Sequence, residues 1–133
     1  MKKVLAGLLV LVLGASVTHA QILDKAKVGN YLKQVGLSYH NYLDANGGKA
    51  PAKAEDLAPY FENDKKLLDA LKSEEIVFLY GVRLVDMTAG SSNTVLAYEK
   101  DAPTKGGQVL YGDGSVKKLA ADDFKKATLA KKK

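Results

Sequence analysis

Few side chains in this sequence could perform chemistry, and they are scattered along the chain. His40 is the only histidine after the first twenty residues, and no second histidine or cysteine stands at helical spacing from it. A metal site needs several ligands, so we expect His40 to pack at the edge of the core or on the surface. The five serines that follow residue 20 share this one possible base, and none stands in a nucleophile elbow: Ser38, Ser73, Ser91, Ser92 and Ser115.

Two pairs of carboxylates are adjacent in the sequence, Glu74 with Glu75 and Asp122 with Asp123. Neighbouring residues on a strand or helix point apart, so neither pair can act as a general acid and base as it stands. No set of nucleophile, base and orienting group can be assembled from the chain. We therefore expect no catalytic residues, and we expect that the protein is not an enzyme.

The glycine-rich stretches 106–107 and 112–114 invite comparison with phosphate-binding loops. Such loops lead into a helix whose N-terminus binds the anion, whereas these stretches lead into predicted strands. Asp113 could contribute to a calcium site, but one carboxylate cannot supply the roughly six to eight oxygens that calcium takes. We therefore predict turns here, with no metal and no cofactor.

Seven tyrosines are the remaining unusual feature. Most fall on predicted core stripes, which favours a rim of half-buried rings. A tyrosine-lined binding patch is the alternative. The seven are Tyr31, Tyr39, Tyr42, Tyr60, Tyr80, Tyr98 and Tyr111.

The element that must position these groups is a helix predicted over residues 28–44. Apolar residues recur there at steps of three and four, and Asn46-Gly47 is a natural helix stop. Gly29 and Gly36 lie seven apart inside it, on nearly the same side. Because each lacks a side chain, we expect another element to approach the helix closely there.

The rest of the chain predicts short helices followed by strands. A short or kinked helical segment is expected over 54–61 and a helix over 65–72, with Asp64 as its N-cap. Alternation of apolar residues predicts a strand over 76–84, with Gly81 as a possible bulge. Further strands are expected at 94–99, 108–111 and 115–119, loops at 88–93 and 101–107, and a short, weak terminal helix over 120–133.

The last two strands are predicted to form a hairpin. Asp-Gly between strands is a strong signal for a two-residue turn, here Asp113-Gly114, with positive φ at both residues. In that register Tyr111 faces Val116. The predicted fold class is therefore α+β, with a long N-terminal helix packed on a small antiparallel sheet, a C-terminal β-hairpin and a short terminal helix.

The first twenty residues resemble a secretory signal peptide. Lys2-Lys3 precede an apolar run over 4–13, and Thr18-His19-Ala20 form a small-residue exit. The run is shorter than the roughly 18 to 20 residues of a membrane-spanning helix, which favours a cleaved signal over the alternative, an uncleaved anchor. We therefore expect cleavage near Gln21 and no stable membrane insertion afterwards. Residues 21–133 then form one exported domain, periplasmic or extracellular. The chain has no cysteine, so its stability must come from the core alone.

Charge argues against a nucleic-acid binder. Removing residues 1–20 leaves 18 basic and 15 acidic residues, a net charge of +3, which equals the contribution of the terminal lysines 131–133. A nucleic-acid-binding domain is expected to carry a basic stripe on its folded body. We therefore expect no nucleic-acid partner.

Three segments carry a resemblance to a known family. Residues 30–42, NYLKQVGLSYHNY, resemble the NLKQIGLALHNYHD segment of a large, mostly planctomycete family of pilin-like proteins, which is related to type II secretion pseudopilins. Residues 93–100 (NTVLAYEK) and 106–116 (GGQVLYGDGSV) resemble that family's closing hairpin. The family has no assigned chemistry, so the resemblance implies a non-enzymatic domain in envelope or secretion-system assembly or in surface interaction.

The chain also departs from the pilin pattern. A pilin signal is cut after a glycine and continues as an uninterrupted apolar helix with Glu at its fifth position. Here neither Gly7 nor Gly14 is followed by such a segment, and Pro103 stands where the family has a histidine. The resemblance therefore implies a short relative without the pilin anchor. The rival hypothesis is a small periplasmic ligand-binding or inhibitory module that uses an open sheet face or a loop.

Overall fold

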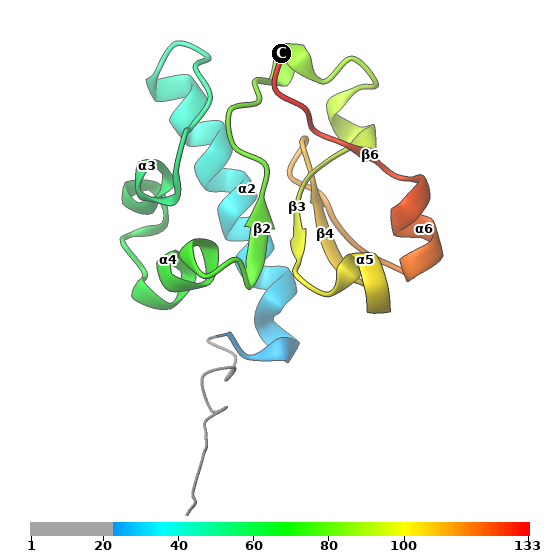
Figure 1. Cartoon of the computed structure of the whole chain (residues 1–133). Coiled ribbons are helices and arrows are strands. Elements are labelled where there is room, and N and C mark those ends of the chain that lie inside the picture. The colour runs from blue at the N-terminus through cyan, green and yellow to red at the C-terminus, as the bar shows by residue number, and fades with distance from the viewer. Residues whose placement is uncertain (1–22) are drawn as a thin grey trace, which may run out of the picture.

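One long helix lies across a face of the sheet and begins with a short 3-10 turn (Figure 1). The computed structural model describes residues 23–133, so the predicted signal segment 1–20 lies outside the described residues. The turn η2 (Lys25–Lys27) runs directly into helix α2 (Val28–Ala45). Asp24 starts the turn, because its carboxylate accepts a hydrogen bond from the backbone N–H two residues later at 3.0 Å. The predicted long helix is confirmed.

Helix α2 ends at the stretch that the sequence predicts. Asn46 is the C-cap, and Gly47 has a left-handed φ of 65°. The N–H of Gly48 donates to the carbonyl of Leu43 at 2.8 Å. This bond satisfies one of the carbonyls that the helix end leaves free, so the glycines here are required by the backbone.

After α2 and before the first strand of the sheet, the chain forms short helical segments that lie at one side of the fold (Figure 1). α3 (Ala54–Leu57) continues as the 3-10 helix η3 (Ala58–Phe61), and α4 (Lys65–Lys72) follows. Asp64 caps α4, because its carboxylate accepts bonds from two of the first backbone N–H groups of the helix. Both helical predictions and the cap are confirmed.

Four antiparallel strands form the sheet in the order in which they occur in the chain. They are β2 (Ile76–Phe78), β3 (Thr94–Glu99), β4 (Gly107–Tyr111) and β5 (Val116–Leu119). A two-residue strand, β6 (Thr128–Leu129), runs parallel to the start of β3. The α+β fold class, with the long helix packed on an antiparallel sheet, is confirmed.

The strand predicted over 76–84 is too long, since β2 ends at Phe78. The C-terminal half of β3 pairs with β2, whereas its first two residues pair with β6. β6 thus occupies the edge that a longer β2 would need, and the chain leaves the sheet before the 3-10 turn η4 (Leu84–Asp86). Gly81 is not a bulge: it has a φ of 80° and donates to the carbonyl of Pro51 at 2.9 Å.

The two predicted loops contain short helical turns. Loop 88–93 includes the 3-10 turn η5 (Ser91–Asn93). Loop 101–107 contains the four-residue helix α5 (Ala102–Lys105), which the sequence analysis missed. Pro103 suits this helix, because it stands in the first turn, where no backbone N–H is needed for helical bonds.

The terminal helix is shorter than predicted. α6 (Ala121–Lys126) has Asp122 and Asp123 in its first turn and lysines in its last, as the helix dipole favours. It stops because the following residues form β6 on the open edge of β3, where Ala130 donates to the carbonyl of Val95 at 2.8 Å.

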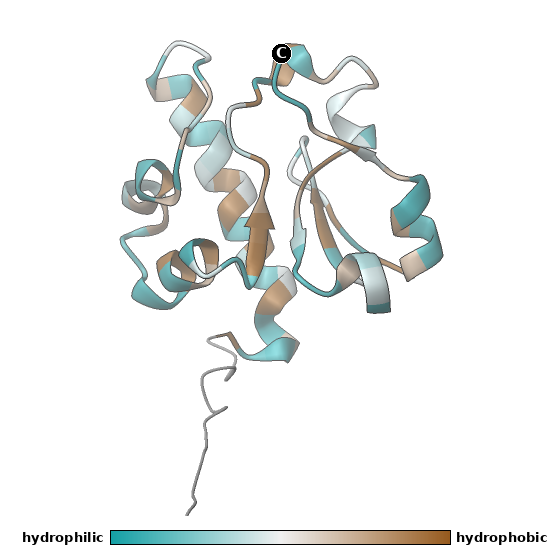
Figure 2. Cartoon of the chain, in the orientation of Figure 1, coloured by the Kyte–Doolittle hydropathy of each residue, from teal (hydrophilic) through white to brown (hydrophobic). Residues whose placement is uncertain are grey.

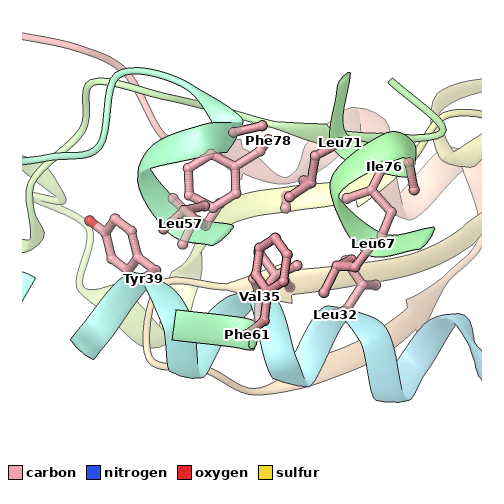
Figure 3. Close-up of a cluster of buried hydrophobic side chains, with 14 of the residues drawn as sticks. Leu32, Val35, Tyr39, Leu57, Phe61, Leu67, Leu71, Ile76 and Phe78 are labelled. Atoms are coloured by element: carbon pink, nitrogen blue, oxygen red, sulfur yellow. The ribbon is translucent and has the colours of Figure 1, made fainter. Parts of the chain in front are cut away.

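The main core lies between α2 and the sheet, and α3, η3 and α4 close it at the side (Figure 3). Leu32 and Val35 are fully buried, whereas Lys33 between them is exposed, as the helical period predicts. Figure 2 shows a similar division between elements: β2 and β4 are largely brown, the colour of hydrophobic residues, and α6 is mostly teal, the colour of hydrophilic ones.

Tyr39 joins the helix to the irregular segment after β2. Its hydroxyl donates to the carbonyl of Val82 at 2.6 Å, and its ring lies 5.9 Å from that of Phe78, centroid to centroid. Burial raises the pKa of Tyr39 to about 12. The phenol therefore stays protonated near neutral pH and satisfies a backbone carbonyl that has no strand partner.

The second face of the sheet is also covered, by α5 and α6. Phe124 of α6 packs there against Tyr98, with ring centroids 4.8 Å apart. A β-bulge in β3 turns two consecutive side chains to the same face, because the pairing of β3 with β4 shifts between Val95 and Ala97. Leu96 and Ala97 face the main core, whereas Val95 and Tyr98 face the smaller cluster. The open sheet face that the rival hypothesis uses is thus filled.

The two glycines inside α2 have different surroundings. A Cβ atom at Gly36 would lie 2.9 Å from Cδ1 of Leu110 and 3.3 Å from Cα of Gly114. At Gly29 the nearest atoms belong to the side chain of Gln108 and would lie at an ordinary 3.9 Å. The predicted close approach is confirmed at Gly36 and wrong at Gly29.

This difference makes Gly29→Ala and Gly36→Ala a matched pair. We expect Gly29→Ala to raise the free energy of unfolding by up to about 1 kcal/mol, the usual difference in helix propensity. Gly36→Ala should lower it, because the new methyl group must displace a buried leucine or the hairpin backbone. Urea unfolding followed by circular dichroism measures both values. Equal stabilisation by the two substitutions would show that α2 and the hairpin are not closely packed.

Candidate functional site

His40 lies on α2 and is bonded to the hairpin loop. Its Nε2 lies 2.7 Å from the carbonyl oxygen of Gly112, so this nitrogen carries a proton and donates. The ring also meets Tyr39 edge to face, with centroids 5.5 Å apart. The side chain is half-buried, which confirms the predicted position at the edge of the core. His40 holds the helix against the hairpin.

The β4–β5 hairpin has a three-residue loop in place of the predicted two-residue turn. The N–H of Tyr111 donates to the carbonyl of Ser115 at 2.8 Å, so Tyr111 lies opposite Ser115 and not opposite Val116. Residues 112–114 form the loop, and within it the positive φ angle, 92°, belongs to Gly114. One left-handed residue that forms a bulge after a turn is the usual geometry of a three-residue hairpin loop.

Asp113 uses its carboxylate inside this loop. Its Oδ1 accepts bonds from the hydroxyl of Ser115 at 2.7 Å and from the N–H of the same residue at 3.0 Å. These bonds lower the pKa of the Asp113 carboxyl, and the bond from the Ser115 hydroxyl has the largest effect. Its φ is not positive, contrary to the prediction, because the longer loop needs only one left-handed residue. Asp113 is therefore a turn-forming residue.

The paired carboxylates have separate surroundings. Glu74 has a φ of 65° in the turn after α4. Glu75 instead accepts a hydrogen bond from the backbone N–H of Leu23, 3.1 Å from its Oε2. In α6, Asp122 lies 3.9 Å from Nζ of Lys125 and both side chains are exposed. Glu75 therefore links the turn before β2 to the start of the described chain, whereas Asp122 pairs within α6.

Three of the serines donate to nearby oxygens. Ser38 is buried and its hydroxyl donates to the carbonyl of Gln34 at 2.7 Å within α2. Ser73 bonds the carbonyl of a residue three positions earlier at the end of α4. Ser115 bonds Asp113, as described above. These bonds belong to helices and turns.

All seven tyrosines are buried or half-buried, which confirms the predicted rim. Tyr42 and Tyr60 meet edge to face, with centroids 6.0 Å apart, and so join α2 to η3. The hydroxyl of Tyr80 is buried, and burial raises the pKa of this group. Ring contacts within the fold account for much of this surface, so a tyrosine-lined patch gains no support here.

Sequence reasoning missed a buried carboxylate, that of Glu99 at the end of β3, which is 8% exposed. Its Oε1 accepts a bond from the N–H of Gln108 at 2.6 Å, and its Oε2 accepts one from Nζ of Lys25 at 2.8 Å. Gly107 makes room for it, because a Cβ atom there would lie 3.0 Å from Oε1. The sequence signal was a glycine directly across a short loop from a strand-ending glutamate.

An open cleft of about 310 Å³ lies beside this ion pair. The hydrogen bond to Glu99 raises the pKa of Lys25, so that lysine is held as the cation of the pair. Lys105 and Lys118 form no ion pair with any residue in 23–133. The polar side chains of the cleft are Lys25, Glu99, Asp101, Lys105, Gln108 and Lys118. Two unpaired cations thus face the opening.

In the part of the chain that the structure describes, large apolar side chains on the surface stand singly. Leu37 on α2 is 62% exposed, and Val85 in η4 is 76% exposed. They lie on different elements. Over residues 23–133, no helix combines the length and the apolar character that crossing a bilayer requires.

The hairpin loop gives a test of the structural role of Asp113. Gly114→Val should lower the free energy of unfolding by at least about 1 kcal/mol, because a β-branched residue is strained at positive φ. A Cβ atom there would meet nothing within 4 Å, so the cost comes from the backbone alone. Asp113→Asn, the control, should change stability by less than about 0.5 kcal/mol, since its side-chain oxygen can accept the same bonds.

Urea unfolding in the presence of calcium and in the presence of a chelator distinguishes a turn from a metal site. We expect the same stability in both conditions for the wild type and for Asp113→Asn. A stabilisation by calcium that disappears in Asp113→Asn would instead make this loop a binding site.

No protein family, no curated protein and no solved structure matches the chain. The resemblance to pilin-like proteins stays a prediction from three short segments, 30–42, 93–100 and 106–116. In the structure these segments lie on α2, on β3 and on the β4–β5 hairpin, and α2 packs against all three strands.

Proposed function

We propose that the protein is an exported, non-enzymatic domain of pilin-like design that acts in envelope or secretion-system assembly or in interactions at the cell surface. The observation that carries the proposal is the arrangement of α2 on the sheet. The three segments that resemble the pilin-like family meet at this helix–sheet contact. The signal-like residues 1–20 precede the helix in the sequence, which supports export.

The use of the polar side chains supports a structural and binding role over a catalytic one. The Glu99 carboxylate is bonded through both oxygens. His40 donates to the backbone of the hairpin, and Asp113 accepts from Ser115. A general base or nucleophile needs such an atom available to a substrate. Here these atoms are bonded within the fold.

Affinity capture from the protein's own cells tests the proposal. The full chain carries a tag after Lys133 and is captured, after mild crosslinking, from the envelope fraction. We expect secretion or pilus components in the captured material, and N-terminal sequencing of the exported protein should start at Gln21 or within a few residues of it. The matched control is a tagged Leu32→Ala chain, whose lost core contact should weaken the fold and the capture together.

Two results would refute this function. The first is retention of the protein in the cytoplasm with Met1 intact. The second is efficient export without any envelope or secretion component in the captured material. Either result would leave the fold unchanged and remove the assembly role.

The rival function, a small ligand-binding or inhibitory module, is favoured by one observation, the cleft with Lys105 and Lys118. Two unpaired lysines suit a small anion. Inorganic phosphate should then shift the backbone amide signals of residues 105–108 in nuclear magnetic resonance spectra. The shifts should disappear in Lys105→Ala with Lys118→Ala. Absence of shifts at millimolar phosphate would exclude this use of the cleft.

A further inference from the structure

The outer edge of β5 leaves backbone groups without strand partners. The N–H of Tyr111 donates to the carbonyl of Ser115, and hydrogen-bonded pairs alternate with non-bonded pairs along an antiparallel ladder. The backbone N–H and C=O groups of residues 115, 117 and 119 therefore point toward β4. The N–H and C=O groups of Val116 and Lys118 therefore point away from the sheet. Gln108, opposite Lys118, agrees with this register, because its N–H points the other way, to Glu99.

The surroundings of this edge differ from those of the opposite edge. Helix α4 lies beside β2 at the other side of the sheet (Figure 1). In β5, Lys117 and Lys118 are exposed. No hydrogen bond among the described residues reaches the backbone of Val116 or Lys118. β5 is thus a short edge strand that presents its backbone and two lysines to solvent.

Positive charge borders the edge on both faces of the sheet. Nζ of Lys117 lies 5.2 Å from the ring centroid of Tyr111, on the face that α6 covers. Lys118 points to the other face and lines the cleft together with Lys105. Consecutive side chains of a strand added at β5 would point to opposite faces of the sheet. One would therefore lie beside Lys117 and the next beside Lys118.

We propose that the edge of β5 binds an extended acidic segment of a partner protein, which adds to the sheet as a further strand. Main-chain bonds to Val116 and Lys118 would supply affinity, and adjacent carboxylates would pair with Lys117 and Lys118. The proposal rests on the proposed function, since it names the chemistry of a partner for the exported domain.

The same charges argue against a second copy of this chain as the occupant. Two β5 strands in antiparallel pairing would set lysines opposite or diagonal to lysines in every register that uses residues 116–119. Like charges directly opposite on a sheet are destabilising. Lysines on an edge strand thus oppose pairing of like strands and favour an acidic strand.

Fluorescence anisotropy with a defined probe tests the proposal. The probe is a labelled peptide, Thr-Val-Glu-Glu-Val-Thr, and the protein is the exported chain. We expect saturable binding, weakened about tenfold when alternate peptide nitrogens are methylated, because each methyl group removes a main-chain donor. Peptides with Gln-Gln or Lys-Lys at the centre should bind more weakly than the Glu-Glu probe.

Substitutions at Lys118 separate the backbone from the charge. Lys118→Pro removes the outward N–H and the charge, whereas Lys118→Ala removes the charge alone. Proline is tolerated on an edge strand where its nitrogen faces solvent, and both variants should keep the wild-type circular dichroism spectrum. We expect Lys118→Pro to bind the probe about tenfold more weakly than Lys118→Ala. Amide exchange at Val116 and Lys118 should be fast in the free wild type and slow with the probe.

Several outcomes would overturn the inference. They are no binding of the Glu-Glu probe, equal binding of the methylated probe, equal binding by Lys118→Pro and Lys118→Ala, and a dimer in sedimentation that Lys118→Pro abolishes. If the probe binds as expected but no envelope component is captured from cells, the assembly function fails and the acidic-strand site stands. If envelope components are captured equally by the wild type and by Lys118→Pro, this inference fails and the assembly function stands.

Discussion

The close contact between α2 and the hairpin at Gly36 is the constraint on which the rest of the structure depends. Without a side chain at this position, the helix comes within van der Waals contact of Leu110 and Gly114. That approach brings His40 to the carbonyl of Gly112, which fixes the loop from the helix side. The hairpin is thereby held in one register, and the register decides which backbone groups of β5 face outward.

A second constraint acts at the other side of β3, where two short strands share one edge. β2 pairs with the end of β3, and β6 pairs with its beginning. The first and the last strand of the sheet in chain order therefore lie along the same strand. The long segment between β2 and β3 is excluded from the ladder and is held instead by Tyr39 and by the bond between Gly81 and Pro51. Irregular backbone is stable here because its polar groups find partners outside the sheet.

Local patterns in the sequence predicted what local physics determines. The helical period located α2, and Asp64 and Asn46 marked helix ends correctly. The length of β2 was wrong, because it depends on β6, a segment far later in the chain. The hairpin register was wrong by one residue, because a Gly-Asp-Gly stretch suits loops of two or three residues equally. Glu99 was missed because its burial requires Gly107 and Lys25, whose contribution appears only in three dimensions.

The ion pair of Lys25 and Glu99 also determines where free positive charge remains. A buried carboxylate is costly unless it is paired and hydrogen-bonded, and here both oxygens are satisfied. Because Lys25 is committed to this pair, the unpaired cations of the cleft are Lys105 and Lys118, and Lys118 lies on β5 itself. The positive charge of Lys25 thus joins the start of the helix to the sheet, whereas the charges of Lys105 and Lys118 face solvent. That separation places the available positive charge beside unpaired backbone, which is the combination that an acidic extended segment can recognise.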